Sequence, residues 1–111
     1  MLAKKYRINK RKEYAYLYKH GKKTNGKYIF IYFTDNHHSY NRFGIVTSKI
    51  VGKAVKRNKA KRILRAVIKC NPLLPGRHIN IVIVATKRIK QATYEAIEQD
   101  YKSVMKKADL W

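Results

Sequence analysis

The sequence predicts a single α+β domain whose helices pack against a small sheet. Three observations support this class. The chain has 111 residues, which suits one compact domain. Hydrophobic residues make up 45% of it, enough to form a core. The elements expected along the chain are helix, strand, strand, helix, strand and helix, with no repeat or linker between them. We therefore expect residues 1–111 to form one domain, with residues 1–8 as a flexible or loosely docked arm.

The first expected helix covers residues 10–20 and is followed by Gly21, a residue type that is common just after a helix. Tyr14 and Tyr18 are four residues apart, so they share one face of this helix. Leu17 is expected to turn toward the core.

A polar turn is expected at residues 22–26, followed by strands at 27–34 and 41–48 with a loop between them. We expect these two strands to pair antiparallel, with one more short strand possible around residues 46–50. Because side chains alternate along a strand, the first strand has two apolar faces that both require cover. These faces are Ile29, Ile31 and Phe33 on one side, and Tyr28, Phe30 and Tyr32 on the other.

The clearest helical pattern covers residues 53–70, after a connector at 49–52. Its apolar stripe has helical spacing and consists of Ala60, Ile63, Leu64, Val67 and Ile68. Residues 79–85 are almost uniformly apolar, which is typical of a central strand buried on both sides. The last helix is expected to start at residue 92 or 93 and to end near 107, with a buried stripe of Ile97, Tyr101, Val104 and Ala108.

Charge is the most unusual property of the chain, since 27 Lys and Arg against 6 Asp and Glu give a net charge of +21. Only Glu13 and Asp35 precede residue 95, and residues 36–94 contain 14 Lys or Arg and no acid. Such charge destabilises a compact chain by self-repulsion, and a densely anionic partner relieves it. Nucleic acid is the first candidate and an anionic membrane surface the second. The position of the acids favours a surface that meets phosphates.

Composition excludes several other classes. The single cysteine, Cys70, cannot form an intramolecular disulfide. No apolar run approaches the roughly 18 residues that span a bilayer, and the charged N-terminus lacks the apolar region of a signal peptide. We therefore expect a cytoplasmic protein. The four histidines have no Cys, Asp or Glu at metal-site spacing, and the acids are too few for hydrolysis by protein side chains. No catalytic residue and no metal site are predicted in the chain.

Two groups of residues are candidates for binding. The first is a basic ridge on the helix at 53–70, where like charges at four-residue spacing repel one another unless phosphates neutralise them. The second is an aromatic groove on which unpaired bases would stack, formed by Tyr14, Tyr18, Phe30 and Tyr32. The alternative for these rings is a place in the core or at its rim.

The segment RFGIVTSKIVGKAVKRNKAKRILRAVIK, residues 42–69, resembles the signature of the bacterial ribonuclease P protein subunit. That family has a strand ending in Ser-Lys-Lys-x-Gly, and then a helix opening with Ala-Val-x-Arg-Asn-Arg. The spacing of Tyr14, Tyr18 and Gly21 also resembles the family, as does the helix start Thr-Tyr-Glu at residues 93–95. This chain departs from the pattern at Lys59, where Arg is usual, at Ile50, where a second Lys is common, and in having Tyr for Phe in the first helix.

The resemblance implies an α-β-β-β-α-β-α fold with a small mixed sheet, like the second domain of the fifth protein of the small ribosomal subunit. It also implies a left-handed crossover through the basic helix. The implied partners are a catalytic RNA, bound one to one, and precursor tRNA, whose 5′ leader that RNA removes using Mg²⁺ held mainly by the RNA. By resemblance, the residues that bind the catalytic RNA are Lys49, Lys53, Arg57, Asn58, Lys61, Arg62 and Arg65.

The resemblance assigns the leader to a cleft formed by Tyr14, Tyr18, Phe30 and Tyr32. The chain would then be the protein cofactor of an RNA-based endoribonuclease, with the catalytic groups in the RNA. The main alternative is a ribosomal or other structural RNA-binding protein without an enzymatic role. A non-specific DNA-binding or membrane-surface protein is a further alternative.

Overall fold

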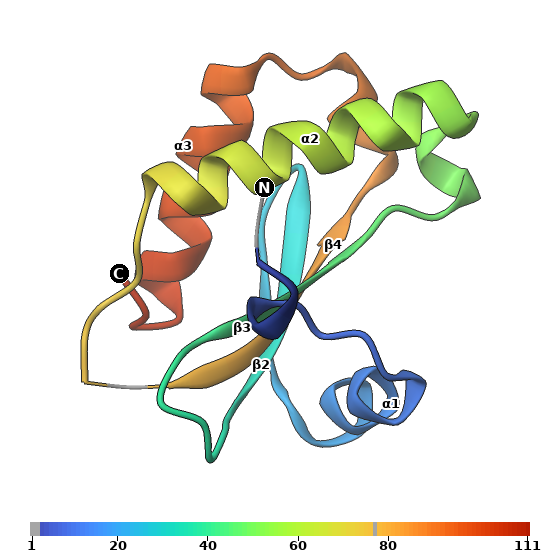
Figure 1. The fold of residues 1–111 in the computed structure, drawn as a ribbon. Coiled ribbons are helices and arrows are strands. Elements are labelled where there is room, and N and C mark those ends of the chain that lie inside the picture. Colours follow the sequence, from blue (N-terminus) through green and yellow to red (C-terminus); the bar gives the residue numbers. More distant parts are fainter. Residues whose placement is uncertain (1–2, 77) are drawn as a thin grey trace.

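A computed structural model describes residues 3–76 and 78–111, and Figure 1 shows its fold. The helices are α1 (Arg11–His20), α2 (Ala54–Cys70) and α3 (Tyr94–Lys107). The strands are β1 (Lys22–Asn25), β2 (Ile29–Asp35), β3 (Arg42–Val46) and β4 (Ile79–Ala85). They form one mixed sheet in the order β1-β2-β4-β3, in which the β3–β4 pair is parallel and the other pairs are antiparallel. The α+β class and the element order α-β-β-β-α-β-α are confirmed.

The additional strand lies elsewhere than expected. Residues 22–25, predicted to be a polar turn, form edge strand β1, whereas β3 ends at Val46 and residues 49–51 form the short 3-10 helix η2. The turn between β1 and β2 is stabilised by Asp100 of α3. Its carboxylate accepts hydrogen bonds from three successive backbone N–H groups at 2.8–3.1 Å, those of Lys27, Tyr28 and Ile29. A polar edge strand lacks the apolar alternation that marks a strand in the sequence, and its stabilising partner is far away in the chain.

The pairing predicted for β2 and β3 is wrong. β4 lies between them and pairs antiparallel with β2 and parallel with β3. The central position suits β4 because its side chains are apolar on both faces of the sheet. The chain therefore passes from β3 through α2 to β4 as a β-α-β crossover. The left hand of this crossover stays a prediction from the resemblance.

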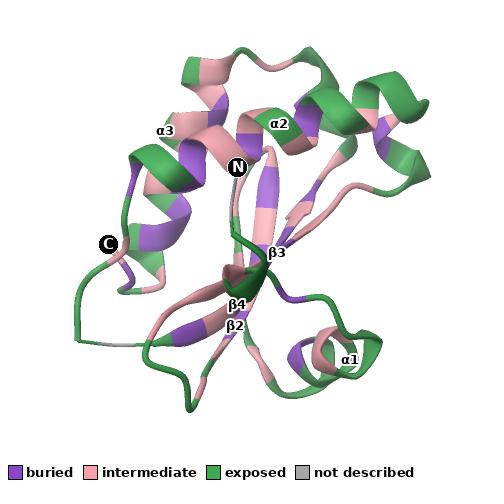
Figure 2. Ribbon diagram, in the orientation of Figure 1, coloured by how far each residue is buried: buried purple, intermediate pink, exposed green. Residues whose placement is uncertain are grey.

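Helices cover both faces of the sheet, as the apolar faces of β2 predict (Figure 1). On one face, Ile29, Ile31 and Phe33 are buried in the main core together with the apolar stripes of α2 and α3. On the other face, Leu17 of α1 packs with Ile8 and Val82 in a smaller cluster. Figure 2 shows the buried residues on the strands and on the inner sides of the helices, with exposed residues predominating at the start of α2.

The N-terminal arm is docked rather than flexible over its described part, residues 3–8. Ile8 is only 4% exposed. Its N–H donates a 2.8 Å hydrogen bond to the carbonyl of Phe43, and Arg7 forms an isolated parallel bridge with the same residue. The apolar side chain of Ile8 in an otherwise basic segment explains the docking, since it completes the cluster under α1. Residues 1 and 2 lie outside the described residues.

The basic helix and the last helix begin as local sequence dictates. Gly52 precedes α2 with φ 136°, a conformation that L side chains avoid, so the chain turns sharply into the helix. Thr93 caps α3, because its Oγ1 accepts a 3.1 Å hydrogen bond from the N–H of Ala96. The predicted stripes are confirmed, with Ile63 and Ala108 only half-buried and Met105 as a further buried residue. None of the described helices has the length and apolarity needed to cross a membrane.

Candidate nucleic-acid interface

The predicted RNA-binding residues of α2 and η2 differ in their exposure. Lys53, Asn58 and Arg62 are exposed, as is Lys49 in η2 (Lys49–Val51), while Arg57, Lys61 and Arg65 are half-buried. The first turn of α2 contains no acid, and no side chain caps its N-terminus. The backbone N–H groups of this first turn and the positive end of the helix dipole add to the attraction for anions.

Arg57 is the most informative of these cations. Its Nε is buried and has no hydrogen-bond partner among the described residues. Buried polar groups are rarely left unpaired, so an unpaired donor calls for an explanation. The guanidinium of arginine is suited to binding two oxygens of one phosphate. Arg57 thus has a buried Nε without a partner in the described part of the chain, while the rest of its half-buried side chain can present the guanidinium on the side of α2 that the resemblance assigns to RNA.

Lys61 and Arg65 connect the basic helix to the aromatic residues. Together with Arg7 and Tyr14 they line a pocket of about 140 Å³ at the edge of β3. The Tyr14 hydroxyl donates a 3.0 Å hydrogen bond to the carbonyl of Ile8, and burial raises the pKa of this phenol. A Cβ at position 44 would lie 2.6 Å from the Tyr14 hydroxyl, so Gly44 lets the ring lie against the strand. Tyr14 thus stands where the arm, β3 and α2 meet.

The other three predicted rings form a contact cluster on the sheet face next to α1. The ring of Tyr32 makes edge contacts with Tyr18, at 5.2 Å between centroids, and with Phe30, at 6.1 Å. Burial, and then the neighbouring Tyr32, raise the pKa of Tyr18. Tyr14 and Tyr32 pack against the same small core cluster. The structure thus gathers Tyr18, Phe30 and Tyr32, while Tyr14 lies nearer the basic helix and belongs to the rim of the core.

A cation that the sequence did not predict lies above this cluster. The Lys23 Nζ lies 4.7 Å from the centroid of Phe30 and 5.6 Å from that of Tyr32. The sequence predicts a turn at residues 22–26, and a turn lacks the alternation that would tell which side of a sheet the Lys23 side chain faces. Its position follows from the pairing of β1 with β2, which sets Lys23 opposite Tyr32. A lysine at this place combines stacking surface with charge, as sites for single-stranded nucleic acid do.

A groove of about 550 Å³ extends the aromatic cluster from Phe30 toward the end of β4. Val84 and Ala85 contribute apolar surface, and Lys27, Lys87 and Arg88 supply positive charge. The exposed Ile50, with 61% of its surface accessible, also lines the groove. These residues were not predicted, because three separate segments contribute them. The only signal in the sequence is the Lys87-Arg88 pair directly after the buried strand.

Lys59, which replaces the arginine usual in the resembling family, lies on a different side of α2. With Lys56 and Lys90 it lines a small hollow of about 10 Å³ near Ile89. The Lys61 and Arg65 side chains line the pocket at β3 instead. The cations of α2 are therefore divided between two sides of the helix.

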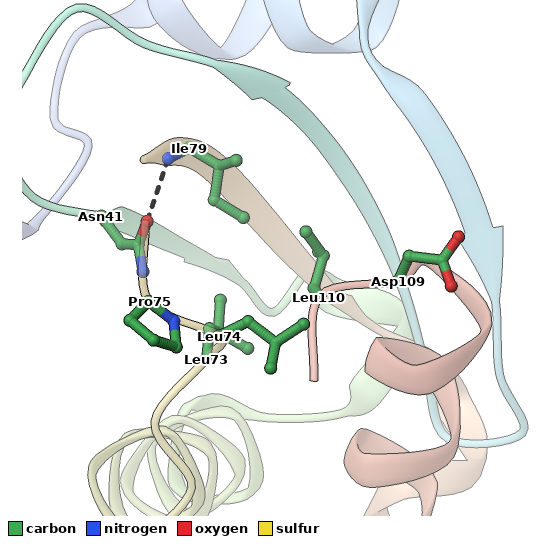
Figure 3. Close-up of a pocket in the computed structure, with 7 residues that line it drawn as sticks. All are labelled: Asn41, Leu73, Leu74, Pro75, Ile79, Asp109 and Leu110. Atoms are coloured by element: carbon green, nitrogen blue, oxygen red, sulfur yellow. Dashed lines mark hydrogen bonds between the residues drawn. The ribbon is translucent and has the colours of Figure 1, made fainter. Parts of the chain in front are cut away.

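A small apolar pocket lies apart from all the predicted site residues. It has a volume of about 120 Å³ and is lined by Leu73, Leu74, Pro75 and Leu110, among others (Figure 3). At its polar edge, the N–H of Ile79 donates a 2.9 Å hydrogen bond to Oδ1 of Asn41. No predicted cation or ring of the binding surfaces lines it.

Acidic side chains of the described residues make bonds that stabilise the fold. Glu13 forms an ion pair with Arg42, Glu98 accepts a 2.9 Å hydrogen bond from the buried Asn71, and Asp100 stabilises the β1–β2 turn. Among residues 3–76 and 78–111, no three His, Cys, Asp or Glu side chains gather in a way that could hold a metal ion. The described residues thus form a cationic and aromatic surface, while Glu13, Glu98 and Asp100 are engaged in the fold.

Comparison with known proteins agrees with these features. The Ribonuclease P family model matches residues 2–109. The ribonuclease P protein component of Syntrophomonas wolfei is 40% identical over 112 aligned residues, covering 100% of this chain and 93% of that protein.

Solved structures are similar as well. The RNase P protein of Staphylococcus aureus has a TM-score of 0.85 and 30% identity, covering 95% of this chain and 96% of its own. That of Thermotoga maritima has a TM-score of 0.79 and 26% identity, covering 91% and 96%. Sequence and fold agree over nearly the whole chain, and the chain therefore belongs to the ribonuclease P protein family.

Proposed function

We propose that this chain is the protein cofactor of an RNA-based endoribonuclease that removes the 5′ leader from precursor tRNA. Membership of the ribonuclease P family supports an RNA partner. The catalytic groups belong to the RNA in this proposal, and so do the main ligands of Mg²⁺. One protein binds one catalytic RNA in the cytoplasm. The chain contributes binding and positioning, since its charge lowers the repulsion between two RNAs.

The catalytic RNA is proposed to bind the basic side of α2. Its contacts are Lys49, Lys53, Arg57, Asn58, Lys61, Arg62 and Arg65, which the fold leaves exposed or half-buried. The half-buried Arg57 supports this assignment, because the accessible part of its side chain lies among the exposed cations of α2 and a guanidinium can bind two oxygens of one phosphate.

The leader is proposed to lie on the ring cluster of Tyr18, Phe30 and Tyr32, with Tyr14 at the side nearest α2. The single observation that carries this part is the pocket in which Tyr14 meets Lys61 and Arg65. Tyr14 lies in this pocket beside two cations of α2, so a precursor that extends from the ring cluster to Tyr14 would be beside the RNA bound to α2. A structural RNA-binding protein would not require an aromatic groove next to its basic helix.

Reconstitution tests the proposal directly. The protein is added to the catalytic RNA at a low Mg²⁺ concentration, and removal of the leader from precursor tRNA is followed. We expect cleavage that neither component supports alone under these conditions. Cleavage that is unchanged when the protein is added would contradict the cofactor role and favour the structural alternative.

The leader site has a sharper test in one helix. Tyr18→Ala is expected to weaken binding of precursor tRNA and to leave mature tRNA unaffected, because only the precursor has a leader to stack on the rings. Tyr16→Ala is the matched control, since Tyr16 is 55% exposed on the same helix and contacts His20 instead of the cluster. Equal losses for precursor and mature tRNA in Tyr18→Ala would reject the leader site.

A further inference from the structure

A groove of about 650 Å³ lies between the N-terminal arm, the start of α1 and the loop that joins β2 to β3. We call it the arm groove. Its cations are Lys4, Lys5, Arg7 and Lys10, and the loop contributes His38 and Tyr40. Its volume is in the range of sites that hold a small ligand. None of the residues assigned above to the catalytic RNA or to the leader lines it.

The charge of the arm groove is almost uncompensated. Its one acidic lining residue, Glu13, is engaged with Arg42, whose Nη2 lies 3.2 Å from Glu13 Oε1. The hydrogen bond from Arg42 lowers the pKa of the Glu13 carboxyl. This pair leaves the four arm cations facing the same space, and all four are exposed. Converging like charges repel, and an anion bound among them relieves the repulsion.

The groove also contains a set of aromatic rings. His38 stacks on Tyr40 with 5.1 Å between centroids and 29° between planes. Tyr6 meets Tyr40 edge-on at 5.2 Å. The Lys5 Nζ lies 4.9 Å from the Tyr6 ring and 5.2 Å from the Tyr40 ring. His38 is exposed at the end of this stack. Exposed rings next to cations are the surface on which an unpaired base stacks while its phosphates are neutralised.

The walls of the groove are fixed by hydrogen bonds. Asn36 stabilises the loop, because its Nδ2 donates to Asn80 Oδ1 at 3.0 Å and to the Tyr40 carbonyl at 3.3 Å, and its Oδ1 accepts from the N–H of His38 at 2.9 Å. The arm is held by the hydrogen bond from Ile8 to Phe43. A preorganised site loses less entropy when a ligand binds.

Arg7 connects the arm groove to the proposed RNA surface. It lines this groove and also the pocket that contains Lys61 and Arg65 of α2. From this arrangement we propose that the arm groove is a further binding site for single-stranded RNA. A base stacks on the exposed ring of His38, which Tyr40 supports from behind, and the adjoining phosphates meet the arm cations. The proposal takes its ligand class from the proposed function, but it does not depend on the leader site.

The test is an NMR titration of the full chain with a short oligouridylate, in which backbone amides report each site separately. We expect saturating shifts at Arg7, His38 and Tyr40. His38→Ala should weaken binding at the arm groove about five-fold or more, as the loss of one stacked base predicts. His37→Ala is the matched control, since His37 is the exposed neighbour that does not line the groove, and its affinity should be unchanged.

Inorganic polyphosphate serves as a probe with phosphates and no bases, and its affinity should be the same in wild type and His38→Ala. Two results would overturn the proposal. One is an oligouridylate titration whose shifts are confined to Tyr18, Phe30 and Tyr32. The other is equal oligouridylate affinity in wild type and His38→Ala, which would make the groove a general anion site. The double variant Tyr18→Ala with Tyr32→Ala should keep the shifts in the arm groove, so failure of the leader site would be recognised separately.

Discussion

At the scale of single residues, Tyr101 shows how fold and function make different demands on tyrosine. Its side chain is completely buried under the sheet, and its hydroxyl has no hydrogen-bond partner among the described residues. Burial strongly raises the pKa of this phenol. A buried hydroxyl without a partner is destabilising, because it loses its hydrogen bonds with water on folding and gains none within the protein. The ring of Tyr101 therefore stabilises the core by its burial, whereas its hydroxyl is a cost to stability.

Tyr101→Phe is therefore expected to raise the free energy of unfolding by about 1 kcal/mol. Tyr14→Phe is the matched control, since its hydroxyl donates to the carbonyl of Ile8, and its removal should lower stability by about 1 kcal/mol. Denaturant unfolding followed by circular dichroism measures both. A loss of stability in Tyr101→Phe would show that the hydroxyl has an important partner.

Lys23 is a second single residue with a specific expectation. Its ammonium lies over two rings of the proposed leader site, so Lys23→Ala should weaken precursor tRNA binding by about two-fold to five-fold, the size of an exposed cation–π or phosphate contact. Lys22→Ala removes the same charge from the neighbouring position, whose side chain points to the opposite side of the strand. Filter binding with precursor and mature tRNA measures the difference, and identical effects of the two variants would reject the role of Lys23.

At the scale of elements, the ion pair between Glu13 and Arg42 ties α1 to β3. Arg42 also donates a 3.2 Å hydrogen bond to the carbonyl of Arg7, so the same guanidinium holds the arm. The arginine lowers the pKa of Glu13 below its ordinary value of 4.5. A carboxyl whose pKa is lower in the folded state stabilises the fold when ionised and ceases to do so when protonated.

The contribution of this pair should thus be complete above pH 4.5 and should disappear as the pH falls through the lowered pKa of Glu13. Glu13→Gln is expected to be less stable than wild type by about 1 kcal/mol at neutral pH, since the pair is partly exposed. The two proteins should become equally stable in acid. Unfolding measured across this pH range tests the expectation, with Glu95→Gln as a control for the general loss of one acid. A difference that persists unchanged in acid would contradict it.

At the scale of the whole molecule, acidic and basic side chains occupy different places. Glu13, Glu98 and Asp100 bind partners within the fold, while α2, the arm and the edge of the β1–β2 hairpin present cations to the surface. A net charge of +21 makes binding to RNA strongly dependent on salt, because each neutralised phosphate releases counterions.

The affinity for the catalytic RNA should accordingly fall linearly with salt on logarithmic axes. Arg57→Ala with Arg62→Ala is expected to flatten that slope by about 1.4–1.8, the share of two phosphate contacts. Lys102→Ala with Lys106→Ala removes the same charge from α3, where both lysines lie near Trp111, and should change the slope less. Equal slopes for the two double variants would show that net charge alone, and no particular face, binds the RNA.

The sequence by itself determined the class of fold, the long helices, the central strand and the residues of the basic helix. These depend on hydrophobic periodicity and on charge patterns within short segments, and both are local properties. The aromatic residues were also identifiable, because alternation along β2 separates Phe30 and Tyr32 from the core side of the strand.

Only the tertiary structure decided which segments meet. The turn before β2 depends on Asp100, some seventy residues away in the chain, and β4 lies between two strands that are neighbours in the sequence. The meeting of Tyr14 with Lys61, the cation of Lys23 over the rings and the arm groove all follow from such long-range packing. Local patterns determine which face of an element is apolar, whereas the free energy of the assembled core determines what lies against it.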